Sequence, residues 1–462
     1  MLEQVPAPVT KVWAWLNESE PTYLVGGALR DLLGHGVPED WDLTTRLTPD
    51  AVEAIGRQKG YRVIPTGKAF GTVTWLSEGG PIEVTTFRRE GRYRDGRRPD
   101  HVEFAASIEE DLSRRDFTMN AIAMAFDGTL IDPYGGAQDL ARGRIVTVGD
   151  PRARFNEDPL RMLRAIRFVG RDLNGHPMRL ESQTFRAIQQ LKDRIVSVSG
   201  ERQRDELTKL LATPHFSDAL AMLDETGILG VIWPEWVACR NFIQYDPRHA
   251  NPVHQHLLET ARWGCTPLLR LAGLLHDIAK PSCFWLDETG IGHFYGHDRV
   301  SALYASRMLA RLGWDNASIE RVALLIEFHL FPWEAAEDRT IRRLIREQGE
   351  EVVAELLDLR SMDVRGAGSV WNQEAVVRLR VATLQREYPA ALRQLQASGQ
   401  DIMQWTGISP GPEVGRWLDR LQDWVDDDPH RNRSELIKAH VLGLASTTIE
   451  DDQDPSLSSR DE

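Results

Sequence analysis

The sequence predicts an α/β domain at the N-terminal end of the chain, followed by a mostly α-helical remainder. Residues 21–133 alternate short β-branched runs with polar helical stretches and glycine-rich turns, which is typical of a mixed α/β domain. From about Asp150 onward, apolar residues recur every three or four positions, so helices are expected there. A chain of 462 residues is too long for one compact core and fits roughly two to four domains.

The bulk composition is that of a globular protein, with 42% apolar residues. Cys239, Cys265 and Cys283 have no zinc-like spacing, and the first residues do not combine a basic segment with an apolar one, so a reduced, cytoplasmic protein is expected. No apolar run approaches the roughly 20 residues that span a bilayer, which predicts that the chain does not enter a membrane.

Charge is distributed unevenly along the chain. The formal net charge of -14 argues against nucleic-acid binding, because contacts with phosphates need local positive charge. However, residues 141–209 contain 15 Arg and Lys against 9 Asp and Glu, whereas residues 446–462 contain 1 against 6. The basic middle is compatible with a face that contacts RNA, and the acidic, low-complexity end is expected to be disordered.

The first candidate site begins with a strand that runs into glycines. A short apolar strand at 23–25 precedes Gly26 and Gly27, and a helix is expected to begin near Ala28, with Arg30 one turn into it. Glycines let the backbone approach a phosphate closely, and a helix N-terminus offers free N–H donors. A glycine pair alone more often marks a simple turn, and GGALRD does not match the dinucleotide pattern GxGxxG.

Two carboxylates follow on the next expected strand. Asp40 and Asp42 are two positions apart, so on a strand they share one face. Like charges this close repel each other unless cations lie between them. A pair of Mg²⁺ ions would satisfy both: one activates an attacking 3′-hydroxyl, and the other holds a triphosphate and stabilises the leaving pyrophosphate. A DxD pair alone is usually a solvated strand end, but the preceding GGxxRD pattern favours the metal site.

Together, GGALRD and DWD resemble the first motif of the nucleotidyltransferase superfamily, and specifically of the class II tRNA nucleotidyltransferases and bacterial poly(A) polymerases. The resemblance implies that Asp40 and Asp42 bind the catalytic Mg²⁺ ions. It also implies a third carboxylate at Glu83 and contacts with the incoming nucleotide from Gly26, Gly27 and Arg30.

Two further motifs follow in the order of this family. SRRDFTMNA, at 113–121, is similar to the motif that handles the ribose and triphosphate, which implies nucleotide-binding roles for Arg115, Asp116 and Asn120. The second, EDPLR, resembles the protein template that selects the base and implies Asp158 and Arg161 as its reading residues.

The template has a physical rationale. Asp158 and Arg161 are three positions apart, so on one helix they share a face. An Asp accepts from the exocyclic amine of C or A, and an Arg donates to the adjacent ring nitrogen, a pattern that U and G invert. Arg164 and Arg167 continue along the helix and are available to hold phosphates. The opposite face of the helix is apolar: Leu160, Leu163, Ile166 and Val169.

Three other segments carry the resemblance further. The segment 87–104 is rich in Arg, Gly and Asp, which predicts a mobile loop. It resembles the loop that full CCA-adding and A-adding enzymes keep and CC-adding enzymes lack, so a CC-only enzyme is the least favoured variant. The segment 197–207 resembles the neck-helix motif, and its Glu201, Arg202 and Arg204 are expected to shape the template helix. The segment 399–425, with PGPEVG, is similar to the last segment of CCA-adding enzymes.

A second chemical centre is expected in the helical half. LAGLLHDIAKP places His276 and Asp277 after an apolar helix face. An HD pair alone is often a hydrogen-bonded couple, but the histidines and the aspartate around it resemble the HD phosphohydrolase superfamily. The resemblance implies four metal ligands: His256, His276, Asp277 and Asp363. It also implies that two further histidines, His297 and His329, bind a second metal or the substrate phosphate. His254 competes with His256, and the LLET that follows favours His256.

The ligand types at this centre indicate the metal and the reaction. Mixed imidazole and carboxylate ligands suit Mn²⁺, Ni²⁺, Co²⁺ or Fe²⁺ better than Ca²⁺. A hydroxide bound to such a metal would hydrolyse phosphomonoesters or 2′,3′-cyclic phosphates at damaged tRNA ends.

The leading prediction is template-free addition of CCA to tRNA 3′ ends from CTP and ATP, with an accessory HD phosphohydrolase. The fold implied by the resemblance begins with an α/β nucleotidyltransferase head at residues 1–140. Mostly α-helical parts follow: a neck at 141–215, a body with the HD domain at 216–395 and a tail at 396–445. The acidic end at 446–462 is expected to be disordered. An A-adding specialist stays open. A poly(A) polymerase is less favoured, because IPTGKAFGTVTW is not the GRRF-like stretch of those enzymes. An HD phosphohydrolase with a merely RNA-binding head is disfavoured by the intact head motifs.

Overall fold

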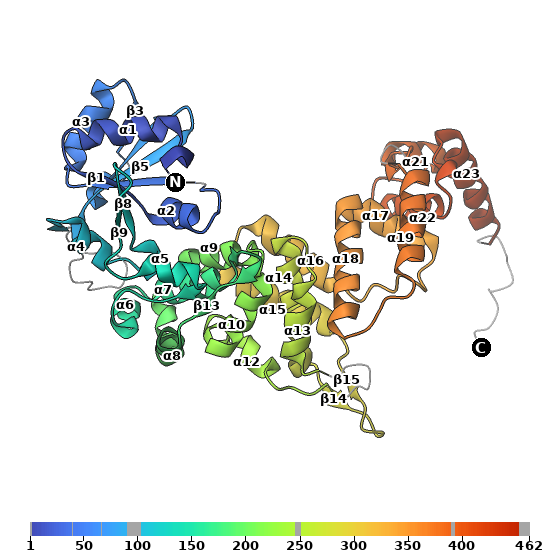
Figure 1. Cartoon of the computed structure of the whole chain (residues 1–462). Helices are drawn as coiled ribbons and strands as arrows, with labels where there is room; N and C mark the ends of the chain where they lie inside the picture. The colour runs from blue at the N-terminus through green and yellow to red at the C-terminus, as the bar shows by residue number, and fades with distance from the viewer. Residues whose placement is uncertain are drawn as a thin grey trace.

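The computed structural model describes residues 2–38, 40–65, 67–89, 103–244, 251–389 and 393–451. The chain is elongated, with a head that contains the main sheet at one end, a helical tail at the other, and a helical neck and body between them (Figure 1). Within the described residues, no helix is both long enough and apolar enough to cross a membrane.

A seven-stranded sheet forms the centre of the head. Its strand order is β3-β4-β5-β2-β1-β8-β9, with β2 and β5 parallel and the other neighbours antiparallel. The strands are β1 (Thr22–Val25), β2 (Trp41–Thr45), β3 (Arg62–Ile64), β4 (Thr72–Ser77), β5 (Gly80–Thr86), β8 (Ala123–Ala125) and β9 (Leu130–Ile131). A separate pair, β6 (Arg88–Arg89) and β7 (Glu103–Phe104), flanks the expected mobile loop, of which residues 90–102 lie outside the described ranges.

Side-chain alternation gives this sheet two different faces. On β2, Trp41 and Leu43 belong to the head core, so Asp42 between them points to the other face. Glu83 on β5 alternates with two core residues in the same way. The core face is packed against α1 (Ala7–Asn17), α2 (Gly26–Leu33) and α3 (Pro49–Gln58), and the head also contains α4 (Ile108–Ser113) and α5 (Gly136–Ala141).

The neck contains α6 (Pro151–Glu157), α7 (Leu160–Val169), α8 (Ser182–Leu191) and α9 (Gly200–Leu211). The predicted apolar face of α7 is buried. Short strand pairs also occur here, β10 (Arg144–Ile145) with β13 (Arg179–Leu180) and β11 (Asp172–Leu173) with β12 (His176–Pro177), although only helices were expected. Pairs of two residues are too short to show an alternating pattern in the sequence.

Three expectations about local structure were wrong. Asp158 does not share a helix with Arg161: it has an extended backbone, with φ -142° and ψ 102°, between α6 and α7. The cause is Pro159, because a proline ring disfavours helical geometry in the residue before it. Helix α2 begins at Gly26 rather than near Ala28, and Asp40 lies just before β2 rather than on it.

The body is an array of helices that shares one continuous core with the neck. Its hairpin consists of β14 (Trp285–Leu286) and β15 (Gly292–His293). Its helices are α10 (Phe216–Thr226), α11 (Ile228–Ile232), α12 (Glu235–Cys239), α13 (Val253–Arg262), α14 (Pro267–Leu275), α15 (His297–Arg311), α16 (Asn316–Glu327), α17 (Asp338–Gln348), α18 (Glu350–Gly366) and α19 (Glu374–Glu387).

The tail has a small core of its own, built from α21 (Gly399–Thr406), α22 (Pro412–Asp427) and α23 (Ser434–Asp451). Disorder was expected from residue 446, but α23 continues to Asp451. Ile437 and Val441 are buried in the tail core and hold the first turns of this helix, and each further residue then adds one hydrogen bond at low cost. Residues 452–462 lie outside the described ranges.

Candidate active sites in the head and the body

A cavity of about 610 Å³ lies between the head sheet and the neck helices. The head residues proposed from the motifs all line this single cavity, although they come from segments as far apart as α2 and α7. They are Gly26, Gly27, Arg30, Asp40, Asp42, Glu83, Arg115, Asp116, Asn120, Asp158, Arg161, Arg164 and Arg167.

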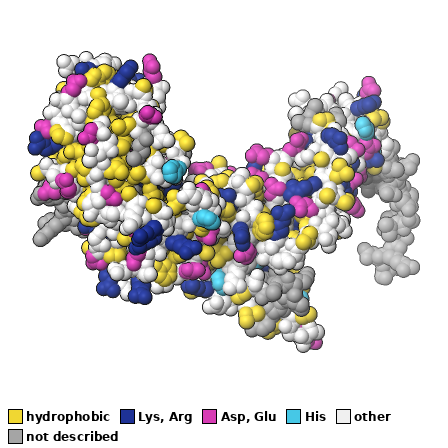
Figure 2. All heavy atoms as spheres, in the orientation of Figure 1, with side chains coloured by type: hydrophobic (Ala, Val, Ile, Leu, Met, Phe, Trp, Pro, Cys, Tyr) yellow, Lys and Arg dark blue, Asp and Glu magenta, His cyan; other side chains and the backbone are white. Residues whose placement is uncertain are grey.

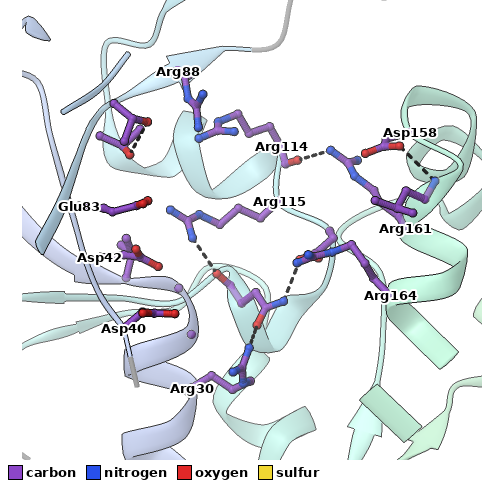
Figure 3. A pocket seen from close by; sticks show the side chains of 18 of the residues that line it. Arg30, Asp40, Asp42, Glu83, Arg88, Arg114, Arg115, Asp158, Arg161 and Arg164 are labelled. Atoms are coloured by element: carbon purple, nitrogen blue, oxygen red, sulfur yellow. Dashed lines mark hydrogen bonds and ion pairs between the residues drawn. The ribbon is translucent and has the colours of Figure 1, made fainter. Parts of the chain in front are cut away.

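Three carboxylates form one wall of the head cavity (Figure 3). Asp42 and Glu83 are directly paired across the parallel strands β2 and β5, and Asp40 precedes β2. Burial and the nearby Glu83 carboxylate raise the pKa of Asp42 to about 6, although Arg115 opposes this shift. Oxygen ligands gathered in this way suit Mg²⁺, which favours carboxylates and phosphate oxygens.

Gly26 brings the β1–α2 turn against this wall. Its φ of +74° is a left-handed conformation that favours glycine. A Cβ atom at this position would lie 2.7 Å from Asp42 Oδ2, so the carboxylate would have to move. The backbone conformation therefore favours glycine, and the absence of a side chain lets the carboxylate lie this close.

A chain of hydrogen bonds crosses the floor of the cavity. Arg30 Nη1 donates to Asn120 Oδ1 at 2.9 Å, and Asn120 Nδ2 donates to Asp116 Oδ1 at 2.8 Å. Arg164 Nη2 lies 2.7 Å from Asp116 Oδ2. Burial alone would raise the pKa of Asp116, but Arg164 and the Asn120 amide outweigh it and lower this pKa to about 2. Asn120 and the ionised Asp116 thus connect Arg30 to Arg164.

Asp158 and Arg161 lie across the cavity from the carboxylates (Figure 3). Asp158 accepts from Arg202 Nη2 at 2.9 Å and from the Leu160 N–H at 3.1 Å. Arg161 Nη1 lies 2.7 Å from Glu157 Oε2. Both side chains are thus fixed at the cavity wall despite the break between α6 and α7.

The neck helix α9 supplies residues that sequence reasoning did not assign to the cavity. Arg202 lines the cavity, while Glu206 accepts from Arg167 Nε at 2.6 Å. Their spacing of four on a predicted helix places both on one face, a signal that was available in the sequence. Arg202 donates to Asp158, the residue proposed for base selection, whereas Arg204 donates to the Gly313 carbonyl in the body. Arg88 and Arg114 also line the cavity and were not singled out.

The second cluster lies in the body, where three helices and two loops converge. His256 comes from α13, His276 and Asp277 follow α14, and Asp363 comes from α18. His256 Nε2 is 3.1 Å from His276 Nε2 and 3.1 Å from Asp363 Oδ1, and His276 Nε2 is 3.2 Å from Asp277 Oδ2. Among the described residues, the two groups that are able to hold a metal ion both lie here.

The orientation of the histidine rings suits metal binding. His276, His297 and His329 each place Nδ1 within 2.6–2.9 Å of a backbone carbonyl oxygen, which turns Nε2 toward the cluster. A hydrogen bond of this kind fixes the tautomer of a metal-ligating histidine. His297 Nε2 lies 3.0 Å from Asp277 Oδ1, and His329 Nε2 lies 3.7 Å from the same atom. His254 is outside the cluster, where its Nδ1 accepts from the Asn241 N–H.

The two aspartates of the cluster stabilise positively charged groups beside them. Burial disfavours a charged imidazole, but Asp277 and Asp363 outweigh it and raise the pKa of His276 to about 10. Lys280, which sequence reasoning missed, is buried with its Nζ 2.6 Å from Asp277 Oδ2. Its position three residues after Asp277 was the only sequence signal for this contact. The cluster opens into a cavity of about 700 Å³, which Arg360 also lines.

Comparisons with known proteins find matching domains and relatives that cover most of the chain. Family models match residues 22–146 as a poly A polymerase head domain, 177–239 as a probable RNA and SrmB-binding site of polymerase A, and 256–367 as an HD domain. The CCA-adding enzyme of Geobacillus sp. is 48% identical over 423 residues, which is 91% of this chain and 92% of that protein. The A-adding tRNA nucleotidyltransferase of Deinococcus radiodurans is 32% identical over 417 residues, 87% and 90% of the two chains.

The chain belongs to the tRNA nucleotidyltransferase family. A solved structure of this family, the CCA-adding enzyme of Bacillus stearothermophilus in complex with CTP, superimposes with a TM-score of 0.71 at 28% identity, covering 97% of this chain and all of that one. The resemblance of the sequence to tRNA nucleotidyltransferases and the predicted order of an α/β head, a helical body and an HD domain are thereby confirmed. The two domain types imply the use of divalent metal ions.

Proposed function

We propose that this chain adds CCA to tRNA 3′ ends from CTP and ATP by two-metal nucleotidyl transfer in the head cavity. The observation that carries the proposal is that one cavity places Asp40, Asp42 and Glu83 opposite Asp158 and Arg161. The relatives of this chain include proteins named CCA-adding enzyme. The reduced, cytoplasmic setting predicted from the sequence is compatible with three cysteines that are free thiols.

The carboxylate wall would hold the metals. Mg²⁺ bound by Asp40, Asp42 and Glu83 would activate the tRNA 3′-hydroxyl and neutralise the charge of the triphosphate. Arg30, in the last turn of the short helix α2, and Arg115, which extends between the walls, are placed to bind the triphosphate.

The base would be read on the opposite wall. The carboxylate of Asp158 receives one donor on each oxygen, from Leu160 and Arg202, and each oxygen keeps a further acceptor site. It is therefore able to accept from the exocyclic amine of C or A. Arg161 would donate to the adjacent ring nitrogen, and Arg202 acts as a positioning residue that keeps the acceptor in place.

The test uses transfer RNAs that end at the discriminator base, at C or at CC, each offered CTP and ATP separately. CTP is expected to extend the first two substrates, and ATP only the third. No CTP addition to the first substrate would overturn CCA addition and leave the A-adding alternative. Repeated ATP addition to any end would instead indicate a poly(A) polymerase.

Asp158→Ala is expected to relax the choice of nucleotide. A specific base contact contributes about 1–3 kcal/mol of discrimination, so the ratio of kcat/KM for CTP over UTP should fall roughly 10- to 100-fold. The ratio is measured on tRNA that ends at the discriminator base. Asp205→Ala on the exposed side of α9 is the matched control and should keep the wild-type ratio. An unchanged ratio in Asp158→Ala would refute the template role.

We further propose that the body cluster is a metal-dependent phosphohydrolase site that acts on phosphomonoesters or 2′,3′-cyclic phosphates at damaged tRNA ends. His256, His276, Asp277 and Asp363 would hold the metal, with His297 and His329 available for a second ion or for the phosphate. Imidazole and carboxylate groups together favour Ni²⁺, Mn²⁺ or Co²⁺. The support is geometric, because the histidine Nε2 atoms and the two carboxylates converge within hydrogen-bonding distances.

A further inference from the structure

Three aromatic rings cluster on and beside the β14–β15 hairpin, and the ring centroids of Trp285 and Tyr295 are 6.2 Å apart. Trp285 and His293 are paired across the two strands, and their ring centroids are 5.0 Å apart at an interplanar angle of 27°. His293 stacks in turn on Tyr295, at 5.4 Å and 9°. We call Trp285, His293 and Tyr295 the aromatic platform. Figure 1 shows this hairpin projecting from the lower edge of the body.

The platform is fixed in place but exposed. Asp287 Oδ2 is 2.7 Å from His293 Nε2, and Asp287 Oδ1 accepts from the Thr289 and Ile291 N–H groups, so the hairpin turn is hydrogen-bonded. Nevertheless, two of its three side chains reach solvent: Trp285 is 48% exposed and Tyr295 is 73% exposed.

Cross-strand stacking stabilises hairpins, and this structural role is enough to explain why aromatic rings occur at Trp285 and His293. It does not explain Tyr295, which lies beyond the end of β15 and has no partner in the strand register. The next ring inward, Phe294, packs against Phe242 and Phe284 and is the residue that anchors this segment to the body. Tyr295 therefore contributes little to the core and presents an aromatic face to solvent.

The platform adjoins the metal-binding cluster. His293 and Tyr295 line the same cavity as Asp277, His297 and Asp363. Tyr295 is two residues from His297, so their Cα atoms are at most about 7.6 Å apart. Lys280 and Arg360, whose positive charges suit a phosphate, line this cavity as well.

We propose that the aromatic platform stacks the unpaired nucleobase of a nucleotide whose phosphate lies at the body cluster. The inference rests on the proposed hydrolase function and narrows its substrate class to nucleotides and single-stranded RNA ends. Aromatic rings stack on bases of any identity, because every base has a π-face. The site would thus distinguish a nucleotide from a phosphate ester that carries no base, and it would do so without strong sequence preference.

Tyr295→Ala and Tyr295→Phe test the platform in the full-length, metal-loaded protein. The substrates are adenosine 2′,3′-cyclic phosphate and glycerol 1,2-cyclic phosphate, which share the cyclic ester but not the base. Tyr295→Ala is expected to lower kcat/KM for the adenosine substrate about 10-fold, mainly through KM, and to leave the glycerol substrate unchanged. Tyr295→Phe keeps the ring and should retain the wild-type values.

Two results would overturn the inference while the hydrolase function stands: equal kinetics of wild type and Tyr295→Ala on the adenosine substrate, or a parallel loss on both substrates. If wild type hydrolyses neither substrate with Ni²⁺, Mn²⁺ or Co²⁺, the hydrolase proposal fails separately. Photo-crosslinking then decides the inference: a short single-stranded RNA with a 3′-terminal 4-thiouridine should crosslink to residues 285–295. Crosslinks confined to the head would overturn it.

Discussion

Asp42→Asn is expected to abolish nucleotide addition, with kcat at least about 10³-fold lower than in the wild type. The substitution removes the charge that binds the proposed metals but keeps the shape of the side chain, and metal catalysis supplies several kcal/mol of transition-state stabilisation. Single-turnover incorporation of CTP into tRNA that ends at the discriminator base measures the effect. Hydrolysis of 2′,3′-cyclic phosphate at the body cluster should be unchanged in this variant. Addition within 10-fold of wild type would contradict the metal-binding role.

A loss of folding is not expected to explain this result. Because the pKa of Asp42 is raised to about 6 in the folded chain, folding disfavours its ionised form at neutral pH. Metal-free wild-type protein should therefore become more stable through this group as pH falls from about 6 toward 4, because the folded state binds the proton more tightly than the unfolded chain does. Asp42→Asn removes that dependence. Its melting temperature at pH 7 without added metal should equal or exceed the wild-type value.

Asp277→Asn is expected to eliminate hydrolysis at the body cluster, with cyclic-phosphate turnover reduced at least about 10³-fold, and to leave CCA addition intact. Asp277 contacts His276, His297 and Lys280, so its charge is central to the cluster. The measurement is metal-dependent release of the 2′-phosphomonoester or 3′-phosphomonoester, alongside nucleotide addition by the same preparation.

The removal of one buried charge also leaves Lys280 without its carboxylate, which is costly for stability. The double variant Asp277→Asn with Lys280→Met removes both charges and is expected to melt closer to the wild type than the single variant does. It should still lack hydrolysis. Hydrolysis that returns together with stability in the double variant would show that Asp277 acts only through folding.

The head site was predictable because its motifs lie at the ends of regular elements. A strand that runs into Gly26 and a DxD pair require little tertiary knowledge, and the position of Glu83 beside Asp42 follows from one pair of parallel strands. The HD cluster was accessible in the same way, since its ligands recur in order along the helices. His256 was preferred over His254, and the structure places it in the cluster.

What escaped prediction depends on contacts between distant segments or on local exceptions to periodicity. The bond from Arg202 to Asp158 joins residues 44 positions apart, and no local pattern indicates it. The extended backbone at Asp158 was missed because helical spacing was given more weight than the proline that follows. Lys280 was assigned no role, although it is a buried partner of Asp277.

The helices that supply the body cluster, α13, α14 and α18, also contribute to the continuous core of the neck and body. A divalent ion held between them would act as a cross-link among helices far apart in sequence. Such an ion binds the folded chain in preference to the unfolded one. A free ion concentration of 100 times its dissociation constant would therefore add about 2.7 kcal/mol to the free energy of unfolding. The supply of transition metal would thereby affect the stability of the fold as well as the activity of one of its two sites.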